Sequence, residues 1–386
     1  MIVWASGTVT AVTGGWPGAV ELTAARDDTH VQVRALAYTD LTPAPSAGDR
    51  VLLNVAALDR GLGTGGYALV VAVLGPDGSV VAQPPQPAGH LVKARYLPLQ
   101  AMVAGADEQG SPHHELLADA DSLDGLPVVV ADLHSALAPT LLALAHDRPG
   151  TRVVYVMSDQ GALPIAFSRT VAQLRDAGLL AATVTVGQAF GGDLEAVTVH
   201  SGLLAARLAL GADVAVVTQG PGNLGTGTRW GFSGVGAGEA VNAVATLGGR
   251  PVASLRVSGA DARPRHRGVS HHSLTAYGRV ALSPADLAVP DLAGAGGLHG
   301  VADRAGLDAL VAMAPDVEEA VRGLTRHHVV RVPLDGLDDA LLASPLRLST
   351  MGRGLDGDPA YFLAAAAAGR HAATLLGPVR QDRPVA

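Results

Sequence analysis

The stretch PVVVADLHS, residues 127–135, decides the fold. Its first part, Val128–Ala131, is a short apolar run typical of a buried strand, and polar residues follow directly. Helical spacing comes next in Ala136–His146, and the same alternation then repeats along the chain. Strands separated by helical segments require parallel crossovers, and apolar strands imply a sheet covered on both faces. We therefore predict a doubly wound α/β domain with a mostly parallel, Rossmann-like sheet over residues 125–386.

The alternation extends from this stretch to the end of the chain. Further strands are predicted at Arg152–Met157, Ala182–Val186, Asp213–Thr218, Pro251–Val257, Val329–Val332 and Leu346–Ser349. Further helices are predicted at Leu163–Ala177, Leu194–Leu210, Ala237–Leu247, Asp303–Ala312, Leu337–Leu342 and Asp358–Leu376.

Residues 1–98 follow a different period. Short runs of alternating residues are separated by Gly and Pro, with no helical spacing, and these features favour a small β-barrel-like domain or a sandwich. The predicted strands are Thr8–Thr13, Ala19–Thr23, His30–Tyr38, Val51–Val55 and Tyr67–Leu74. Residues 99–124 are expected to connect this domain to the α/β domain.

The composition excludes several chemistries. The 386 residues include no Cys, so neither an Fe–S cluster nor a thiolate metal site is expected. Lys93 is the only lysine among 27 basic residues, so a pyridoxal phosphate Schiff base would have to use it, and we expect none. No GxxxxGK[ST] stretch is present, which excludes a P-loop nucleotide site.

Charge and hydropathy indicate the setting. A net charge of −8 and 3% aromatic residues make a nucleic-acid partner unlikely on composition. The sequence shows neither a signal peptide nor an uninterrupted apolar segment of about 18–20 residues, so we expect a cytoplasmic protein with no membrane partner. Small-residue helices leave a homo-oligomer open.

The unusual residues fall after the predicted strands. In an open parallel sheet, ligands bind outside the carboxyl ends of the strands. The loops that would share this rim are 132–135, 158–161, 187–195, 219–228, 258–273 and 350–354. Their common placement favours one binding site at the rim.

The loop Gly220–Thr228 is one candidate for binding an anion. Its backbone N–H groups and hydroxyls could surround an anionic group, although Pro221 argues against a dinucleotide fingerprint. A sharp turn beside a packed helix accounts for the same glycine-rich sequence equally well. The candidate ligand-binding residues are Gly220, Gly222, Gly225, Thr226, Gly227 and Thr228.

The segment 263–272 is the densest cationic stretch, with three Arg and three His in ten residues. Arginine matches phosphate or carboxylate bidentately, so Arg265 and Arg267, with Arg353 from the last loop, are candidate ligand-binding residues. His266 and His271 are candidate acid–base residues. A solvated basic loop is the alternative.

Further candidates are acidic residues, histidines and the lone lysine. Asp132, His134 and Asp193 are candidate catalytic residues, and Lys93 is a candidate ligand-binding residue. A divalent metal is one option for a cofactor, with Asp193, Glu195, His271 and His272 as the candidate ligands. First-turn acids at the start of a helix would explain Asp193 and Glu195 as well.

Long motifs along the chain match a known pattern. They are Gly7–Val9, Gly48–Asn54, Leu62–Tyr67, Gly89–Gln100, Ser111–His114, Leu133–Ser135, Ala189–Val197, Gly220–Gly234, Arg265–His272 and Met351–Arg353. Over nearly its whole length the chain resembles an uncharacterised bacterial family, domain of unknown function 3866. The resemblance implies no activity. The family pattern has a histidine where this chain has Gln188, which argues against a catalytic role at that position.

Two functional hypotheses follow. The first is an enzyme, a hydrolase or group transferase, that acts on a phosphorylated or nucleotide-like small molecule at the strand-end rim. The second is a non-catalytic sensor or scaffold protein, whose β domain recognises a partner while the rim binds an effector. Turnover of the bound ligand discriminates between them.

Overall fold

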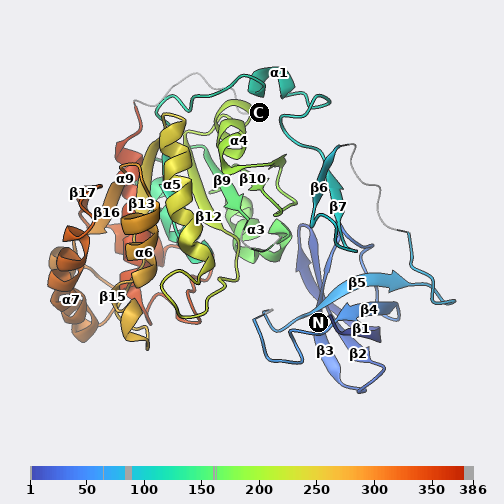
Figure 1. The fold of residues 1–386 in the computed structure, drawn as a ribbon. Coiled ribbons are helices and arrows are strands. Elements are labelled where there is room, and N and C mark those ends of the chain that lie inside the picture. Colours follow the sequence, from blue (N-terminus) through green and yellow to red (C-terminus); the bar gives the residue numbers. More distant parts are fainter. Residues whose placement is uncertain (1, 64, 83–88, 160, 162, 378–386) are drawn as a thin grey trace.

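The computed structural model describes residues 2–63, 65–82, 89–159, 161 and 163–377. Its first part is a closed five-stranded barrel with the strand order β1-β2-β3-β5-β4, at the lower right of Figure 1. The strands are β1 (Trp4–Trp16), β2 (Ala19–Arg26), β3 (Gln32–Tyr38), β4 (Arg50–Asn54) and β5 (Ala68–Leu74). The barrel prediction is thereby confirmed over the sandwich.

The barrel closes because β1 is long enough to pair with two strands. Its first half pairs with β4 and its second half with β2, both antiparallel. Small side chains fill the interior, among them Ala24, Ala35 and Ala68, which are fully buried. A barrel built from alanine and valine needs no aromatic core, in keeping with the low aromatic content.

The second part is an eight-stranded sheet in which all the paired strands are parallel. The order is β11-β10-β9-β12-β8-β13-β16-β17. Its strands are β8 (Pro127–Val130), β9 (Val153–Ser158), β10 (Ala182–Val186), β11 (Leu194–Ala196), β12 (Val214–Gln219), β13 (Arg250–Ser254), β16 (Asp286–Pro290) and β17 (His328–Val332). All four residues of β8 are buried, as expected for a central strand covered on both faces.

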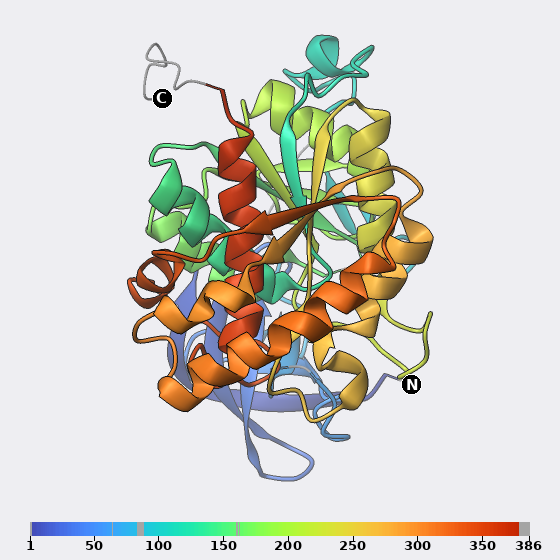
Figure 2. The same cartoon turned by 90° about the vertical axis from the view of Figure 1, so that its left-hand side faces the viewer.

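Helices cover the two faces of the sheet. Figure 2 shows α9 and α5 on opposite sides of the strands, and α2 packs along α9. The helices are α1 (His114–Leu117), α2 (Leu137–Asp147), α3 (Arg169–Asp176), α4 (Val199–Leu204), α5 (Gly236–Thr246), α6 (His271–Thr275), α7 (Arg304–Arg322), α8 (Leu337–Leu342) and α9 (Pro359–Thr374). The doubly wound α/β prediction is confirmed. Among the described residues, no helix is both long and apolar enough to cross a membrane.

Three elements differ most from the predictions. The helix predicted at Leu194–Leu210 begins at Val199, because Leu194–Ala196 pair with β10 as the edge strand β11, and Thr198 caps the helix. Residues 346–349 form no strand; their leucines are buried without a neighbouring strand to pair with. The strand β16, flanked by prolines, was not predicted.

The connecting segment contains a short hairpin, β6 (Leu91–Lys93) and β7 (Ala101–Val103), followed by α1. The predicted boundary at residue 98 falls inside this hairpin. Lys93 at its base reaches the edge of the large sheet, where its Nζ donates hydrogen bonds to the carbonyl oxygens of Gly187 and Ala189. The segment is therefore anchored to the α/β domain rather than hanging between the two domains.

The barrel also contacts the α/β domain directly, at the start of α3. Trp16 Nε1 donates a hydrogen bond to the Ala166 carbonyl at 2.6 Å, and the Arg169 guanidinium lies 4.4 Å over the Trp16 ring. Arg169 also forms an ion pair with Glu21 and a hydrogen bond with the Tyr67 hydroxyl. A single arginine thus contacts three strands or strand ends of the barrel.

Candidate functional site

Three neighbouring strands at the centre of the sheet, β12, β8 and β13, lead to the same rim. The strand order reverses here, since β9, β10 and β11 lie on one side and β13, β16 and β17 on the other. Crevices form at such switch points, outside the carboxyl ends of the strands. Asp132 follows β8, residues 220–232 follow β12, and residues 255–270 follow β13 and lead into α6.

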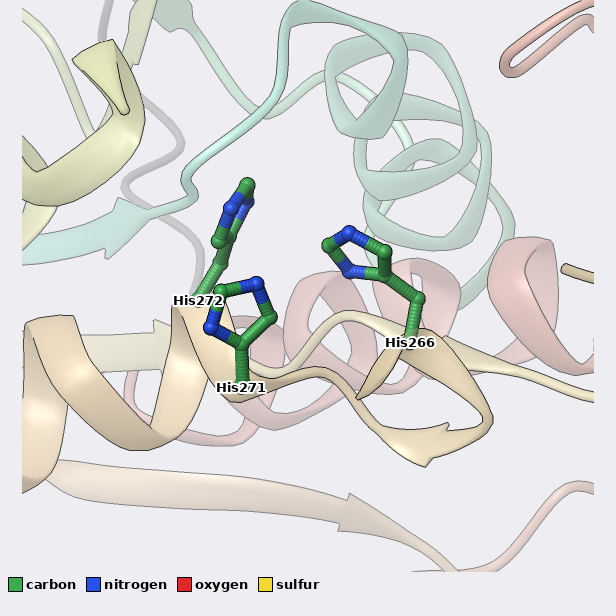
Figure 3. A group of neighbouring side chains, drawn as sticks. All are labelled: His266, His271 and His272. Atoms are coloured by element: carbon green, nitrogen blue, oxygen red, sulfur yellow. The ribbon is translucent and has the colours of Figure 1, made fainter. Parts of the chain in front are cut away.

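Three histidines meet at this rim, as Figure 3 shows. His266 lies in a 3₁₀ turn of the loop after β13, and His271 and His272 lie in the first turn of α6. One nitrogen from each ring can be chosen so that the three atoms lie within 4.8 Å of one another. The ring centroids are separated by 4.4 to 4.9 Å.

The loop after β13 folds back on itself to bring the histidines together. Its two arms, β14 (Val257–Ser258) and β15 (Gly268–Val269), pair antiparallel, and α6 starts immediately afterwards. Ser270 caps α6: its Oγ accepts a hydrogen bond from the His272 amide and lies 2.7 Å from His266 Nδ1. One hydroxyl therefore fixes both the start of the helix and the orientation of His266.

Burial and nearby arginines keep all three imidazoles neutral. Burial, followed by the charges of Arg256 and Arg263, lowers the pKa of His266 to about 3. Burial is also the main reason that the pKa of His272 falls to about 3. The pKa of His271 is lowered by burial and then by Arg265. Neutral imidazoles can accept protons or bind a metal ion.

Asp132 lies beside the histidines. Its side chain is 3% exposed, and its Oδ2 accepts no hydrogen bond within the described part of the chain, although it lies 4.0 Å from His272 Nδ1. Burial raises the pKa of Asp132 to about 6, and the charge of Arg256 opposes that rise. Unsatisfied buried carboxylates are rare, which makes this residue a functional candidate.

The nitrogen Nε2 of His271 has the same property. It is buried and has no hydrogen-bond partner among the described residues. On the other side of the cluster, the Phe232 ring stacks on His272 with a centroid distance of 3.7 Å. The cluster is thus packed on one side and leaves two polar atoms, one on Asp132 and one on His271, without hydrogen-bond partners among the described residues.

Buried ion pairs hold the surrounding loops in place. Asp261 pairs with Arg263 and Arg256, at 2.9 and 3.5 Å, and Asp358 pairs with Arg353 at 3.0 Å. Hydrogen bonds, chiefly from Arg263, keep the pKa of Asp261 well below its usual range despite burial. The Arg353 guanidinium is therefore already paired with a carboxylate of the protein itself.

The predicted anion ligands divide into two groups. Arg353 is paired as described, and Arg267 Nε donates to the Asp261 carbonyl at 3.0 Å. Arg265 is exposed and forms no hydrogen bond or ion pair with any residue that the structure describes. The same holds for Arg229, which was not predicted, and both arginines lower the pKa of His271.

The glycine-rich loop lies next to Arg265. A side chain at Gly227 would meet the Arg265 guanidinium at 3.6 Å. Much of the loop's polarity is satisfied internally, because the Thr226 and Thr228 hydroxyls bond to each other and the Thr226 amide donates to the Gly231 carbonyl. Gly220 is instead a packing requirement, since a Cβ there would lie 2.7 Å from Leu163.

The structure places His134 outside the cluster. Its ring nitrogens lie 3.1 Å from the Tyr155 hydroxyl and 2.7 Å from Ser168 Oγ, both at the side of the sheet near α3. Burial lowers the pKa of His134 to about 4. Both nitrogens have partners, so His134 fits a structural role.

Lys93 and the acids Asp193 and Glu195 are also elsewhere. Lys93 Nζ pairs with Glu195 at 3.1 Å, and both side chains are buried. Asp193 pairs with Arg175 and accepts a hydrogen bond from the Thr183 hydroxyl. These carboxylates join β10 to β11 and do not meet His271 or His272. Gln188 nearby accepts a hydrogen bond from the Arg95 amide.

Several residues of the rim were not among the predicted site residues. Besides the exposed Arg229, they include Arg256, Asp261, Phe232 and Asp358, all four of which are buried. Arg256 was assigned to the interior of the strand predicted at Pro251–Val257, whereas β13 ends at Ser254. The sequence signal that could have identified Arg256 is its charge at the end of an otherwise apolar strand.

A known protein family matches most of the chain, including the residues of the rim. A family model described as "Protein of unknown function (DUF3866)" matches residues 34–369, from β3 to α9. No curated protein matches the chain.

Proposed function

The chain belongs to the family of unknown function DUF3866, and we propose from the geometry of the rim that it is an enzyme. It hydrolyses or transfers a group of a phosphorylated or nucleotide-like small molecule. The observation that carries the proposal lies at the switch point of the sheet, where two arginines without an ion pair among the described residues meet neutral histidines. One of these histidines has a buried nitrogen with no hydrogen-bond partner in the same part of the chain.

Arg265 and Arg229 supply the affinity for the anion. Guanidinium groups bind phosphate oxygens bidentately, and neither arginine forms an ion pair with a carboxylate in the part of the chain that the structure describes. Their charge reaches His271, whose pKa both of them lower after burial. An anion at this point would compensate that charge, so a phosphate group is the ligand that the electrostatics favour.

His271 is the candidate proton acceptor. Its buried Nε2 has no partner in the described chain, so a water molecule or a substrate hydroxyl could donate a hydrogen bond to it. In hydrolysis, the water oxygen forms a bond to phosphorus while the bond from phosphorus to the leaving oxygen breaks. His271 takes the proton from the water and returns it to the leaving oxygen.

Asp132 supports the proton transfer as a positioning residue. Its carboxylate lies 4.0 Å from His272 Nδ1, and the rings of His271 and His272 are adjacent, with centroids 4.4 Å apart. A negative charge at Asp132 stabilises positive charge that develops on the histidines. Such a group acts through its charge, without touching the substrate.

The test is a panel of nucleotides and sugar phosphates, screened by thermal shift and then for release of product. Arg265→Ala should weaken binding by roughly 10- to 100-fold, since hydrogen bonds to charged groups contribute about 1.5–3 kcal/mol. His271→Gln should keep most of the affinity and lose turnover by about 10²- to 10⁴-fold.

Arg250→Ala is the matched control. Arg250 is equally exposed but lies at the beginning of β13, at the end of the sheet opposite to the rim. Unchanged binding in Arg265→Ala, for a ligand that stabilises the parent protein, would refute the site. Tight binding with no product from any ligand would favour the sensor hypothesis over the enzyme.

A further inference from the structure

We propose that His266, His271 and His272 together bind one divalent transition-metal ion of the Zn²⁺ type. Three neutral imidazoles with a fourth position open to solvent or substrate are a common ligand set for catalytic zinc. Only the use of this ion in catalysis rests on the proposed function. Its binding rests on the geometry of the three side chains. With the ion bound, His271 Nε2 is a ligand and cannot take a proton, so the attacking water would instead be activated at the fourth position of the ion.

The spacing of the histidines is close to that of a ligand set. One nitrogen from each ring can be chosen so that all three lie within 4.8 Å of one another. Two nitrogens bound to the same tetrahedral zinc ion at about 2.0–2.1 Å are about 3.3–3.4 Å apart. The widest pair therefore has to close by about 1.5 Å through side-chain rotation. Figure 3 shows the rings grouped around one space.

The partners of the rings leave suitable nitrogens for the ion. His266 Nδ1 lies 2.7 Å from Ser270 Oγ, so Nδ1 can donate to that oxygen while Nε2 faces the ion. Nε2 of His271 is buried and has no partner among the described residues. Histidine ligands of metals usually hold their second nitrogen by such a hydrogen bond.

His272 has its Nδ1 beside a carboxylate and a guanidinium. Asp132 Oδ2 lies 4.0 Å away and Arg256 Nη1 lies 3.4 Å away. Binding an ion through Nε2 puts the proton on Nδ1, where Asp132 Oδ2, which is buried and has no hydrogen bond among the described residues, is the available acceptor. Arg256 can only donate, so it gives up its 3.4 Å contact with Nδ1 and keeps the one with Asp261. The orphaned carboxylate thus acquires a partner when the ion binds.

The charges of the rim allow a cation. The buried or partly buried groups that surround the cluster are three arginines and three aspartates, namely Arg256, Arg263, Arg353, Asp132, Asp261 and Asp358. Their formal charges balance when all are ionised, and the exposed Arg229, Arg265 and Arg267 add positive charge that solvent screens. An ion here and Arg265 beside it would together present a positive surface that is suited to an anionic ligand.

The experiment uses the full chain, treated with a chelator and dialysed. Titration with Co²⁺, followed by visible absorption, and competition with Zn²⁺ should give one ion per chain. His271→Gln and His266→Gln should each weaken Co²⁺ binding by at least about 100-fold. Asp132→Asn should weaken it by about 10- to 100-fold, with the same stoichiometry.

His200→Ala is the control, because His200 is exposed on α4 and does not belong to the cluster. This variant should bind Co²⁺ as the parent does. Circular dichroism of the metal-free variants checks that they fold. If a variant does not fold, the parent protein still decides: saturable binding of one Co²⁺, with a spectrum of nitrogen ligands and a rise in melting temperature, is expected. Absence of such binding in the parent, or unchanged binding in a folded His271→Gln variant, would overturn the proposal.

The two proposals fail separately. Ligand binding is measured on the metal-free protein with the phosphate panel, and Co²⁺ binding is measured without any phosphate ligand. Metal binding without a phosphate ligand refutes the proposed function alone. Binding of a phosphate ligand to a protein that takes no metal refutes the inference alone.

Discussion

At the scale of single residues, Lys93 links the β6–β7 hairpin to the edge of the large sheet, and we call this contact the joint. Its Nζ donates hydrogen bonds to the carbonyl oxygens of Gly187 and Ala189 and forms an ion pair with buried Glu195. Lys93→Met should destabilise the protein by about 3–5 kcal/mol, because it leaves Glu195 as a buried charge without its counter-ion. Urea unfolding measures this loss.

The double variant Lys93→Met with Glu195→Gln should recover part of the loss, since it removes the uncompensated charge. Arg95→Ala, two residues away and exposed, should change stability by less than about 0.5 kcal/mol. A Lys93→Met variant as stable as Arg95→Ala would contradict this view of the joint.

His327 provides a pH-dependent contribution to stability. The Ala285 amide donates to its Nδ1 at 3.1 Å, and its Nε2 lies 2.7 Å from the Tyr277 carbonyl, an arrangement that requires the neutral ring. Burial lowers the pKa of His327. A group whose pKa is lower in the folded state stabilises the protein above its unfolded pKa, near 6.5, and that stability disappears as the pH falls.

His327→Asn tests this contribution. Asn can still accept from the Ala285 amide but cannot titrate, so it should cost about 1–2 kcal/mol at pH 7.5 through the lost contact with Tyr277. Between pH 7.5 and 5.5 the parent should lose more stability than the variant, in urea titrations at each pH. Parallel loss in both proteins would show that His327 does not titrate as expected.

At the scale of secondary-structure elements, the packing of α9 on α2 depends on a glycine. A Cβ at Gly369 would lie 2.2 Å from the Thr140 carbonyl oxygen, which is backbone and cannot move independently. Gly369→Ala should therefore destabilise the protein by about 1–3 kcal/mol, although alanine is more favourable than glycine inside a helix by about 1 kcal/mol.

Gly323→Ala is the control with the opposite sign. Gly323 ends α7 with φ of −71°, and a Cβ there would have an ordinary contact at 3.6 Å. This variant should be neutral or more stable in thermal unfolding. Equal destabilisation in both variants would mean that the close approach of α9 to α2 is not the reason.

The elements that the sequence predicts well are those with strong local signals. Val128–Ala131 is an apolar run followed by helical spacing, the pattern of a buried strand and its crossover helix. The observed β8 and α2 lie within one residue of the predicted bounds. The edge strand β11 has three residues and no apolar run, so its identity depends on pairing with β10, which the local sequence does not encode.

The site could be predicted only in part for the same reason. His266, His271 and His272 are close in sequence, and their cluster follows from one folded loop. Asp132 was placed at the rim by its position after a strand. The partners of Lys93 and His134 come from segments 21 to 103 residues away, and no spacing rule specifies such contacts.

At the scale of the whole molecule, Arg169 determines how the barrel sits on the α/β domain. It covers Trp16 and pairs with Glu21. Arg169→Ala should weaken this docking by about 1–2 kcal/mol and expose the Trp16 ring to water. In a background without Trp4 and Trp230, the Trp16 fluorescence should shift to longer wavelength.

Arg175→Ala is the control on the same helix. Arg175 pairs with Asp193 of the α/β domain, and within the described chain no contact joins it to the barrel. Its removal should leave the Trp16 emission unchanged. If both variants shift the emission equally, α3 has changed as a whole and Arg169 has no special part in the docking.

The buried joint at Lys93 has a practical consequence for chemical labelling. Because Lys93 is the only lysine and is 1% exposed, a reagent that acylates primary ε-amines finds none on the surface of the folded protein. Acylation of Lys93 requires the hairpin to separate from the sheet edge. Mass spectrometry of that single peptide over time would give the rate at which the joint opens.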